Sequence, residues 1–68
     1  MLLPENKQAT VVEIIGGSGL IKRLYELGFT PGAKVRVLSS SGPILVDVRG
    51  TRIALGKGVV MKIIVNPE

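Results

Sequence analysis

Residues 27–38, with the sequence LGFTPGAKVRVL, decide the fold because they combine a helix end, a turn and a strand. Gly28 stands where a left-handed residue would end a helix. Pro31 and Gly32 are adjacent, as they are at the centre of a type II turn. Apolar and basic residues then alternate over residues 33–38, a pattern typical of a strand with one buried face. The segment therefore predicts a helix that turns sharply into a half-buried strand.

The helix itself is predicted over residues 20–27, where apolar side chains recur with i, i+1, i+4 and i+7 spacing. Ser18 is the predicted N-cap. The glycine-rich residues 16–19 separate this helix from a β-branched strand predicted over residues 9–15. They lack the Lys-Ser/Thr pair of a phosphate loop, and Lys22 stands where a dinucleotide fingerprint needs its third glycine. We therefore interpret the glycines as a sharp turn from strand into helix.

Three further strands are predicted over residues 44–49, 52–55 and 61–65. A tight hairpin at residues 50–51 joins the first two, and glycines interrupt the chain at residues 56–58. Five short strands with one short helix inserted after the first predict a mainly β fold. We expect a small SH3-like five-stranded barrel, because curling hides the edges of so small a sheet. The residues expected to face its interior are Val35, Ile44, Val46, Val48, Ile53, Leu55 and Ile63.

The composition excludes several classes of function. The chain has 68 residues, of which 46% are hydrophobic, and it contains no Cys and no His. One domain over residues 1–68 is therefore expected, without disulfides, without an ordinary zinc, haem or iron–sulfur site, and without triad-type catalysis. The carboxylates are scattered along the sequence, so no metal site and no cofactor are predicted, and the chain is not expected to be an enzyme. These carboxylates are Glu5, Glu13, Glu26, Asp47 and Glu68.

The apolar residues are not arranged as a membrane anchor. No stretch approaches the roughly 20 apolar residues that a spanning helix needs. Residues 1–5 lack the basic and apolar regions of a signal peptide. We therefore expect a cytoplasmic protein.

Basic residues gather on one predicted face. The formal net charge is +4, and strand alternation turns five cations outward with Asp47 as the one acidic residue among them. This face is either ordinary solvated surface or a site for an acidic protein, anionic headgroups or nucleic acid. Nucleic acid is disfavoured because the two aromatic residues, Tyr25 and Phe29, fall outside the basic strands. The five cations are Lys34, Arg36, Arg49, Arg52 and Lys62.

The helix and its turn carry more large apolar side chains than one buried face requires. About half of them are expected in the core, and the rest are expected to form a partner-binding groove or patch. Leu45 and Ile64, at outward strand positions, are expected to extend it. The six side chains are Leu20, Ile21, Leu24, Tyr25, Leu27 and Phe29.

The motifs together resemble a known family. Residues 23–35 follow the pattern RLxELGFxPGxxV, and residues 42–44 (GPI) and 49–55 (RGTRIAL) follow further along. In this combination they closely resemble the FeoA family, small ferrous iron transport proteins of bacteria and archaea. A similar domain ends the iron-dependent repressors. The resemblance extends over residues 9–66.

The resemblance implies an SH3-like accessory protein of ferrous iron uptake that acts with the permease FeoB, which carries a cytosolic G-protein domain. This chain departs from the family pattern at two places. The loop at residues 39–43 is shorter and lacks an Asp, and residues 56–58 should form a poor helix. The helix–turn segment, residues 20–32, is the expected contact. The expected partner-binding residues are Leu20, Arg23, Leu24, Tyr25, Leu27, Phe29, Pro31, Arg49 and Arg52.

Other interpretations remain open at this point. A small basic barrel would bind nucleic acid through Arg36, Arg49 and Arg52, although no nucleic acid is expected as a partner. A repressor-type regulatory interaction module is a third possibility. The basic face favours a position beside the membrane without insertion. Self-association is possible through the apolar face of the helix.

Overall fold

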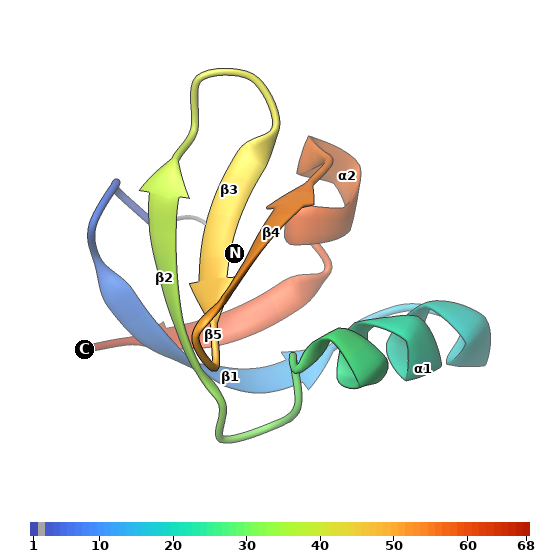
Figure 1. The fold of residues 1–68 in the computed structure, drawn as a ribbon. Helices are drawn as coiled ribbons and strands as arrows, with labels where there is room; N and C mark the ends of the chain where they lie inside the picture. Colours follow the sequence, from blue (N-terminus) through green and yellow to red (C-terminus); the bar gives the residue numbers. More distant parts are fainter. Residues whose placement is uncertain (2) are drawn as a thin grey trace.

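The computed structural model describes Met1 and residues 3–68. Five antiparallel strands form one curved sheet with the order β4-β3-β2-β1-β5 (Figure 1). A helix of ten residues follows the first strand, and a short second helix precedes the last. The elements are β1 (Gln8–Ile14), α1 (Ser18–Leu27), β2 (Lys34–Ser39), β3 (Ile44–Val48), β4 (Thr51–Leu55), α2 (Lys57–Val60) and β5 (Ile63–Pro67).

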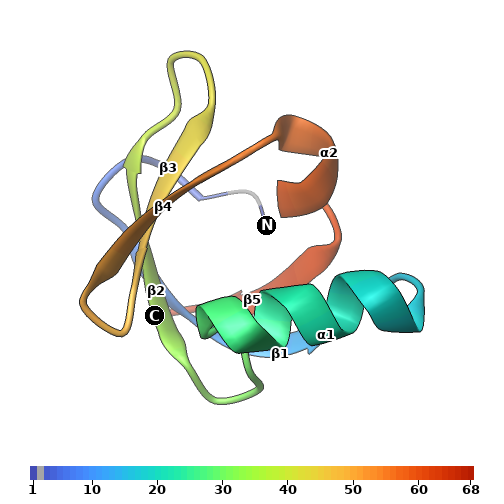
Figure 2. The same ribbon diagram turned by 45° about the vertical axis from the view of Figure 1, so that its right-hand side comes forward.

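The sheet is open, so the expected closed barrel is wrong. Strands β4 and β5 are the two ends of the strand order, and neither pairs with the other. Register shifts in the β1–β5 and β2–β3 pairs help the sheet to curl, but five short strands do not complete the circle. Figure 2 shows the chain passing from β4 through α2 to β5, with α1 lying beside the opening. The two helices thus stand where a closed barrel would have further strand pairing.

Helix α1 ends as the sequence predicts but begins differently. Gly28 adopts a left-handed conformation with φ 110°, and its N–H and that of Phe29 bond to the carbonyls of Tyr25 and Leu24. This is a Schellman termination. At the other end Gly17 is the N-cap and no side chain among the described residues caps the helix, so the assignment of Ser18 as N-cap is wrong. Ser18 is instead the first helical residue.

The turn after α1 places the largest core side chain. Pro31 and Gly32 are its central residues, with Gly32 at φ 90°, and the Ala33 N–H donates to the Thr30 carbonyl at 2.9 Å. This confirms the predicted type II turn. The helix end and the turn together hold Phe29 in the interior, where its side chain is fully buried. The core around it consists of Met1, Ala9, Val11, Ile14, Leu24, Ala33, Val35, Val37, Val46, Val48, Leu55, Val60 and Ile63.

Inward positions of the middle strands agree with the predicted alternation. Val46 and Val48 are fully buried, whereas Ile44 and Ile53 are only half-buried. The hairpin between β3 and β4 turns at Arg49 and Gly50, one residue earlier than predicted. Both turn residues have positive φ (52° and 80°), which makes this a type I′ turn matched to the twist of the strands.

Helix α2 was not expected, because residues 56–58 contain two glycines. The carbonyl of Gly56 accepts hydrogen bonds from the N–H groups of Val59 and Val60, and Val60 is buried. Tertiary packing of Val60 therefore overrides the poor helix propensity of glycine. The ammonium of Met1 donates to the Val60 carbonyl at 2.6 Å, and burial lowers the pKa of this ammonium. Because α2 and its turn occupy this region, β5 begins at residue 63 rather than 61.

Candidate functional site

The predicted contact residues on α1 and its turn divide between the core and the surface. Leu24 is 2% exposed and Phe29 is fully buried, so both belong to the core. Phe29 therefore has no surface that a bound partner could reach while the fold is intact, and Leu24 offers only the small exposed part that lines the groove described below. Leu27 is 40% exposed on the same helix, and Leu20 is half-buried. These two side chains remain available at the surface.

A groove of about 280 Å³ lies between α1 and β4. Its helix side consists largely of apolar side chains with one cation, Arg23, and its strand side is formed by consecutive residues of β4 and by the start of α2. We call this the helix groove. It is lined by Leu20, Arg23, Leu24, Leu27, Ile53, Ala54, Leu55, Gly56 and Val59.

Other predicted contact residues lie outside the helix groove. Tyr25 is 41% exposed and Pro31 is exposed, but neither lines the groove. Arg49 is tied to the end of α1, because it donates to the Gly28 carbonyl at 3.3 Å and to the Thr30 hydroxyl at 2.8 Å. Arg52 is an exposed residue of β4, beside the strand positions that line the groove. Of the predicted set, the structure thus gathers only part at one concave surface.

The sequence pattern does not identify the strand side of the groove. Ile53 was expected to face the interior, and Ala54 was not assigned to any site. The alternation of side chains along β4 distinguishes its inner face from its outer face, but does not identify the strand next to β4. That neighbour follows from the strand order, in which β4 is an edge. No short-range signal identifies Ala54, Gly56 or Val59 as groove residues.

A second groove, of about 490 Å³, crosses β1, β2 and the β3–β4 hairpin. Three of the five cations expected on one outward face line it, together with Asp47. We call it the basic groove. It is lined by Gln8, Gly32, Ala33, Lys34, Val35, Arg36, Asp47, Arg49 and Gly50.

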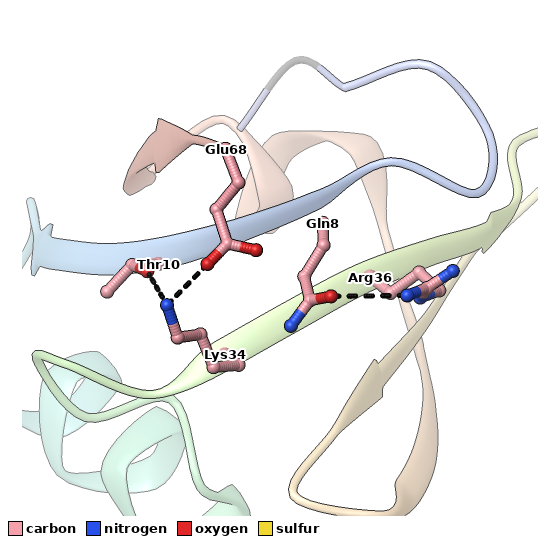
Figure 3. A network of polar contacts seen from close by, with 5 residues as sticks. All are labelled: Gln8, Thr10, Lys34, Arg36 and Glu68. Atoms are coloured by element: carbon pink, nitrogen blue, oxygen red, sulfur yellow. Dashed lines mark hydrogen bonds and ion pairs between the residues drawn. The ribbon is translucent and has the colours of Figure 1, made fainter.

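The cations of the basic groove have partners within the chain. Figure 3 shows Lys34 between Thr10, whose hydroxyl it meets at 3.0 Å, and Glu68, with which it forms an ion pair. Arg36 donates to the Gln8 side-chain carbonyl at 3.1 Å in the same view. Because Arg49 is held at the end of α1, all three groove cations make polar contacts inside the protein. The remaining two of the five, Arg52 and Lys62, are exposed but do not line this groove.

The residues that the structure describes contain neither a cluster of metal ligands nor a membrane-spanning helix. No group of three or more His, Cys, Asp or Glu side chains there could hold a metal ion. No helix in the same part of the chain is long and apolar enough to cross a membrane.

Comparisons with known proteins agree with this architecture. The FeoA domain family matches residues 1–67. A protein of Methanocaldococcus jannaschii that carries the name Fe(2+) transport protein A is 36% identical over 63 residues, which is 91% of this chain and 77% of that protein.

Solved structures are similar over nearly the whole chain. The crystal structure of an iron uptake regulatory protein (FeoA) has 38% identity and a TM-score of 0.90, covering 97% of this chain and 89% of the other. A zinc complex of Stenotrophomonas maltophilia FeoA, described as a procaryotic SH3 domain protein, has 31% identity and a TM-score of 0.84, with 94% and 84% covered.

One further match bears on the fold alone. T. acidophilum IdeR has 22% identity and a TM-score of 0.87, and the match covers 97% of this chain but 32% of that protein. The SH3-like fold is therefore confirmed, although the sheet is open. The family match over residues 1–67 and the 36% identity to the archaeal relative show that this chain belongs to the FeoA domain family.

Proposed function

We propose that this protein is a cytoplasmic accessory protein of ferrous iron uptake that binds the cytosolic G-protein domain of a FeoB-type permease through the helix groove. The family and the name of the archaeal relative support the role in ferrous iron transport. The observation that carries the docking site is the helix groove itself, with Leu27 40% exposed beside it. Exposed apolar side chains that gather at a concave surface are typical of partner sites.

Different leucines of α1 pack in the core and lie at the surface, and this arrangement favours docking. Leu24 already fastens the helix to the core, so Leu20 and Leu27 can be covered by a partner without any loss of internal packing. Covering an exposed leucine contributes roughly 25 cal/mol for each Å² of apolar surface removed from water. Arg23 lies among them and offers a charged contact at the rim, which favours the correct partner and orientation.

Charge favours a position at the cytoplasmic membrane surface. The net charge of +4 is attracted to anionic lipid headgroups. A protein held near this surface would also lie near the cytosolic parts of a permease. In this proposal the protein is close to the membrane but not inserted, and it neither catalyses a reaction nor holds a cofactor.

Isothermal titration calorimetry against the purified cytosolic domain of the permease from the same organism tests the proposal. The titration is run with the GDP-bound and the GTP-analogue-bound domain. We expect saturable binding in at least one nucleotide state, and Leu27→Glu should weaken it by more than tenfold. A lack of heat in both states, at concentrations where the chain is shown to be monomeric, would refute the proposed partner.

A matched substitution controls for the introduction of a charge. Val12 on β1 is 49% exposed and lines neither groove, so Val12→Glu places the same charge at a comparably exposed apolar position. We expect its affinity to stay within about twofold of the unmodified chain. An equal loss of affinity for Val12→Glu and Leu27→Glu would mean that the helix groove is not the contact surface. Sedimentation of both variants shows whether self-association competes with binding.

A further inference from the structure

The helix groove follows the free edge of a strand. Its lining includes four consecutive residues, 53–56. Successive side chains of a strand point to opposite faces, so a groove that lies over one face touches every second residue. A groove that touches consecutive residues therefore runs along the backbone edge of β4. In Figure 2, β4 passes above α1 on its way to α2.

This edge has unpaired backbone groups. Arg49 and Gly50 form the two-residue turn, so Val48 and Thr51 are the hydrogen-bonded pair that closes the hairpin. Pairs in an antiparallel ladder alternate between bonded and non-bonded. The N–H and C=O groups of Arg52 and Ala54 therefore point away from β3. Among the described residues, no backbone hydrogen bond outside the β3–β4 ladder involves either of them.

We infer that the helix groove receives an extended acidic segment of the partner protein, which adds to β4 as a sixth strand of the sheet. The main-chain groups of Arg52 and Ala54 would bond to this segment, as in other complexes that form by strand addition. Alternate side chains of the segment would enter the groove against Leu20 and Leu27. The identity of the partner rests on the proposed function, whereas the manner of binding rests on the groove and the strand edge.

The charges at this edge select the occupant. Arg23 lines the groove, and Arg52 stands on the outer face of β4 next to it. Among the described residues, neither side chain has a hydrogen-bond or ion-pair partner. An added strand that alternates apolar and acidic residues would place carboxylates beside Arg52 while its apolar side chains face α1. The edge strands of a second copy of this chain, β4 and β5, contain no acidic residue, so they would place no carboxylate beside Arg52.

Amide hydrogen exchange followed by NMR tests the inference on the unmodified chain. The probe is a synthetic eight-residue peptide that alternates valine with glutamate, and a valine–lysine peptide of the same length is the control. With the acidic peptide at millimolar concentration, exchange at the Arg52 and Ala54 amides should slow by at least tenfold. The control peptide should leave both rates unchanged. Unaltered exchange at both amides with the acidic peptide would overturn the inference.

Two substitutions at one position separate backbone from side-chain effects. Ala54→Pro removes the outward N–H, and proline is tolerated at such a position of an edge strand. Ala54→Val keeps the N–H and has a high strand propensity. We expect the proline variant to lose binding of the acidic peptide and the valine variant to retain it. Equal binding by both variants would contradict strand addition, and the exchange measurement stands even if the proline variant does not fold.

The two proposals can fail separately. Slowed exchange with the acidic peptide, combined with no calorimetric binding of the permease domain, would refute the proposed partner and leave strand addition intact. Binding of the permease domain without any change in exchange at Arg52 and Ala54 would refute strand addition and leave the proposed function intact.

Discussion

The helix groove and the basic groove are both concave, but they differ in what their groups already bind. In the basic groove Lys34, Arg36 and Arg49 each make polar contacts with other parts of the chain. In the helix groove Leu27 is substantially exposed, and the edge of β4 offers backbone groups that have no strand partner in the described part of the chain. The basic groove has the higher charge, yet the helix groove has more capacity for new contacts.

This difference shows why a count of charges is a poor guide to a binding site. A cation that is held by a carboxylate or a hydroxyl must give up that contact before it binds a ligand, so part of the gain is lost. An exposed apolar side chain gives up only water, and its burial is favourable. We therefore rank the helix groove above the basic groove, and we expect substitutions to affect the two surfaces differently.

The largest loss of stability is expected from a substitution on the buried face of α1. Leu24 is 2% exposed, so Leu24→Ala should lower the free energy of unfolding by about 2–5 kcal/mol through lost burial and a cavity. Leu27→Ala, at a side chain 40% exposed, should lower it by less than about 1 kcal/mol. Urea unfolding followed by circular dichroism measures both values. Equal losses for the two leucines would contradict the division of α1 into a core face and a binding face.

The next largest loss of stability is expected at the C-terminal end of α1, which lies between Leu27 of the helix groove and Arg49 of the basic groove. Gly28 has φ 110°, and an added Cβ would lie 3.4 Å from the Arg49 side chain. Gly28→Ala should therefore cost about 1–3 kcal/mol of stability from backbone strain. Thermal unfolding shows the loss, with Gly58→Ala as the control because its Cβ would meet nothing within 4 Å. A fully stable Gly28→Ala protein would show that the left-handed termination of α1 is not required.

A smaller effect on binding distinguishes the cations of the two grooves. Arg23→Glu should weaken binding of the permease domain about tenfold, which corresponds to roughly 1.4 kcal/mol, because Arg23 faces the proposed occupant. Arg36→Glu reverses the same charge in the basic groove and should change the affinity by no more than about twofold. Calorimetry at two salt concentrations separates this local effect from long-range attraction. The opposite ranking of the two variants would favour the basic groove as the contact surface.

The smallest effect is expected from the ion pair between Lys34 and Glu68. Both side chains are partly exposed, at 56% and 42%, so water and salt screen their attraction. Lys34→Ala should change the free energy of unfolding by no more than about 1 kcal/mol and leave the affinity for the permease domain unaltered. Denaturant titration checks the first value. A loss above about 2 kcal/mol would mean that the polar network on β1 and β2 organises the sheet.

Local features of the fold were predictable from the sequence where short-range chemistry determines them. Gly28 ends α1 and Pro31-Gly32 forms the type II turn, because each depends on the allowed dihedrals of one or two residues. Burial of Val35 and Val37 follows from strand alternation. Helix α2 was missed because its stability comes from the packing of Val60 against distant strands, which local propensity does not record.

The candidate site was predictable only in part for the same reason. Leu20, Arg23 and Leu27 stand out in the sequence, and all three line the helix groove. Leu24 and Phe29 are also large and apolar, but they are buried in the core. Whether such a side chain is buried or exposed depends on the direction in which α1 meets the sheet. The role of Ala54 depends on β4 being an edge, which is a property of the whole strand order.

An NMR titration of the isotope-labelled chain with the cytosolic domain of the permease shows which of the two grooves binds the partner. If the helix groove is the docking surface, shift changes are expected at Leu20, Leu27 and Ala54, with little change at Lys34 and Arg36. Shift changes confined to Lys34, Arg36 and their neighbours would contradict this expectation and would make the basic groove the docking surface.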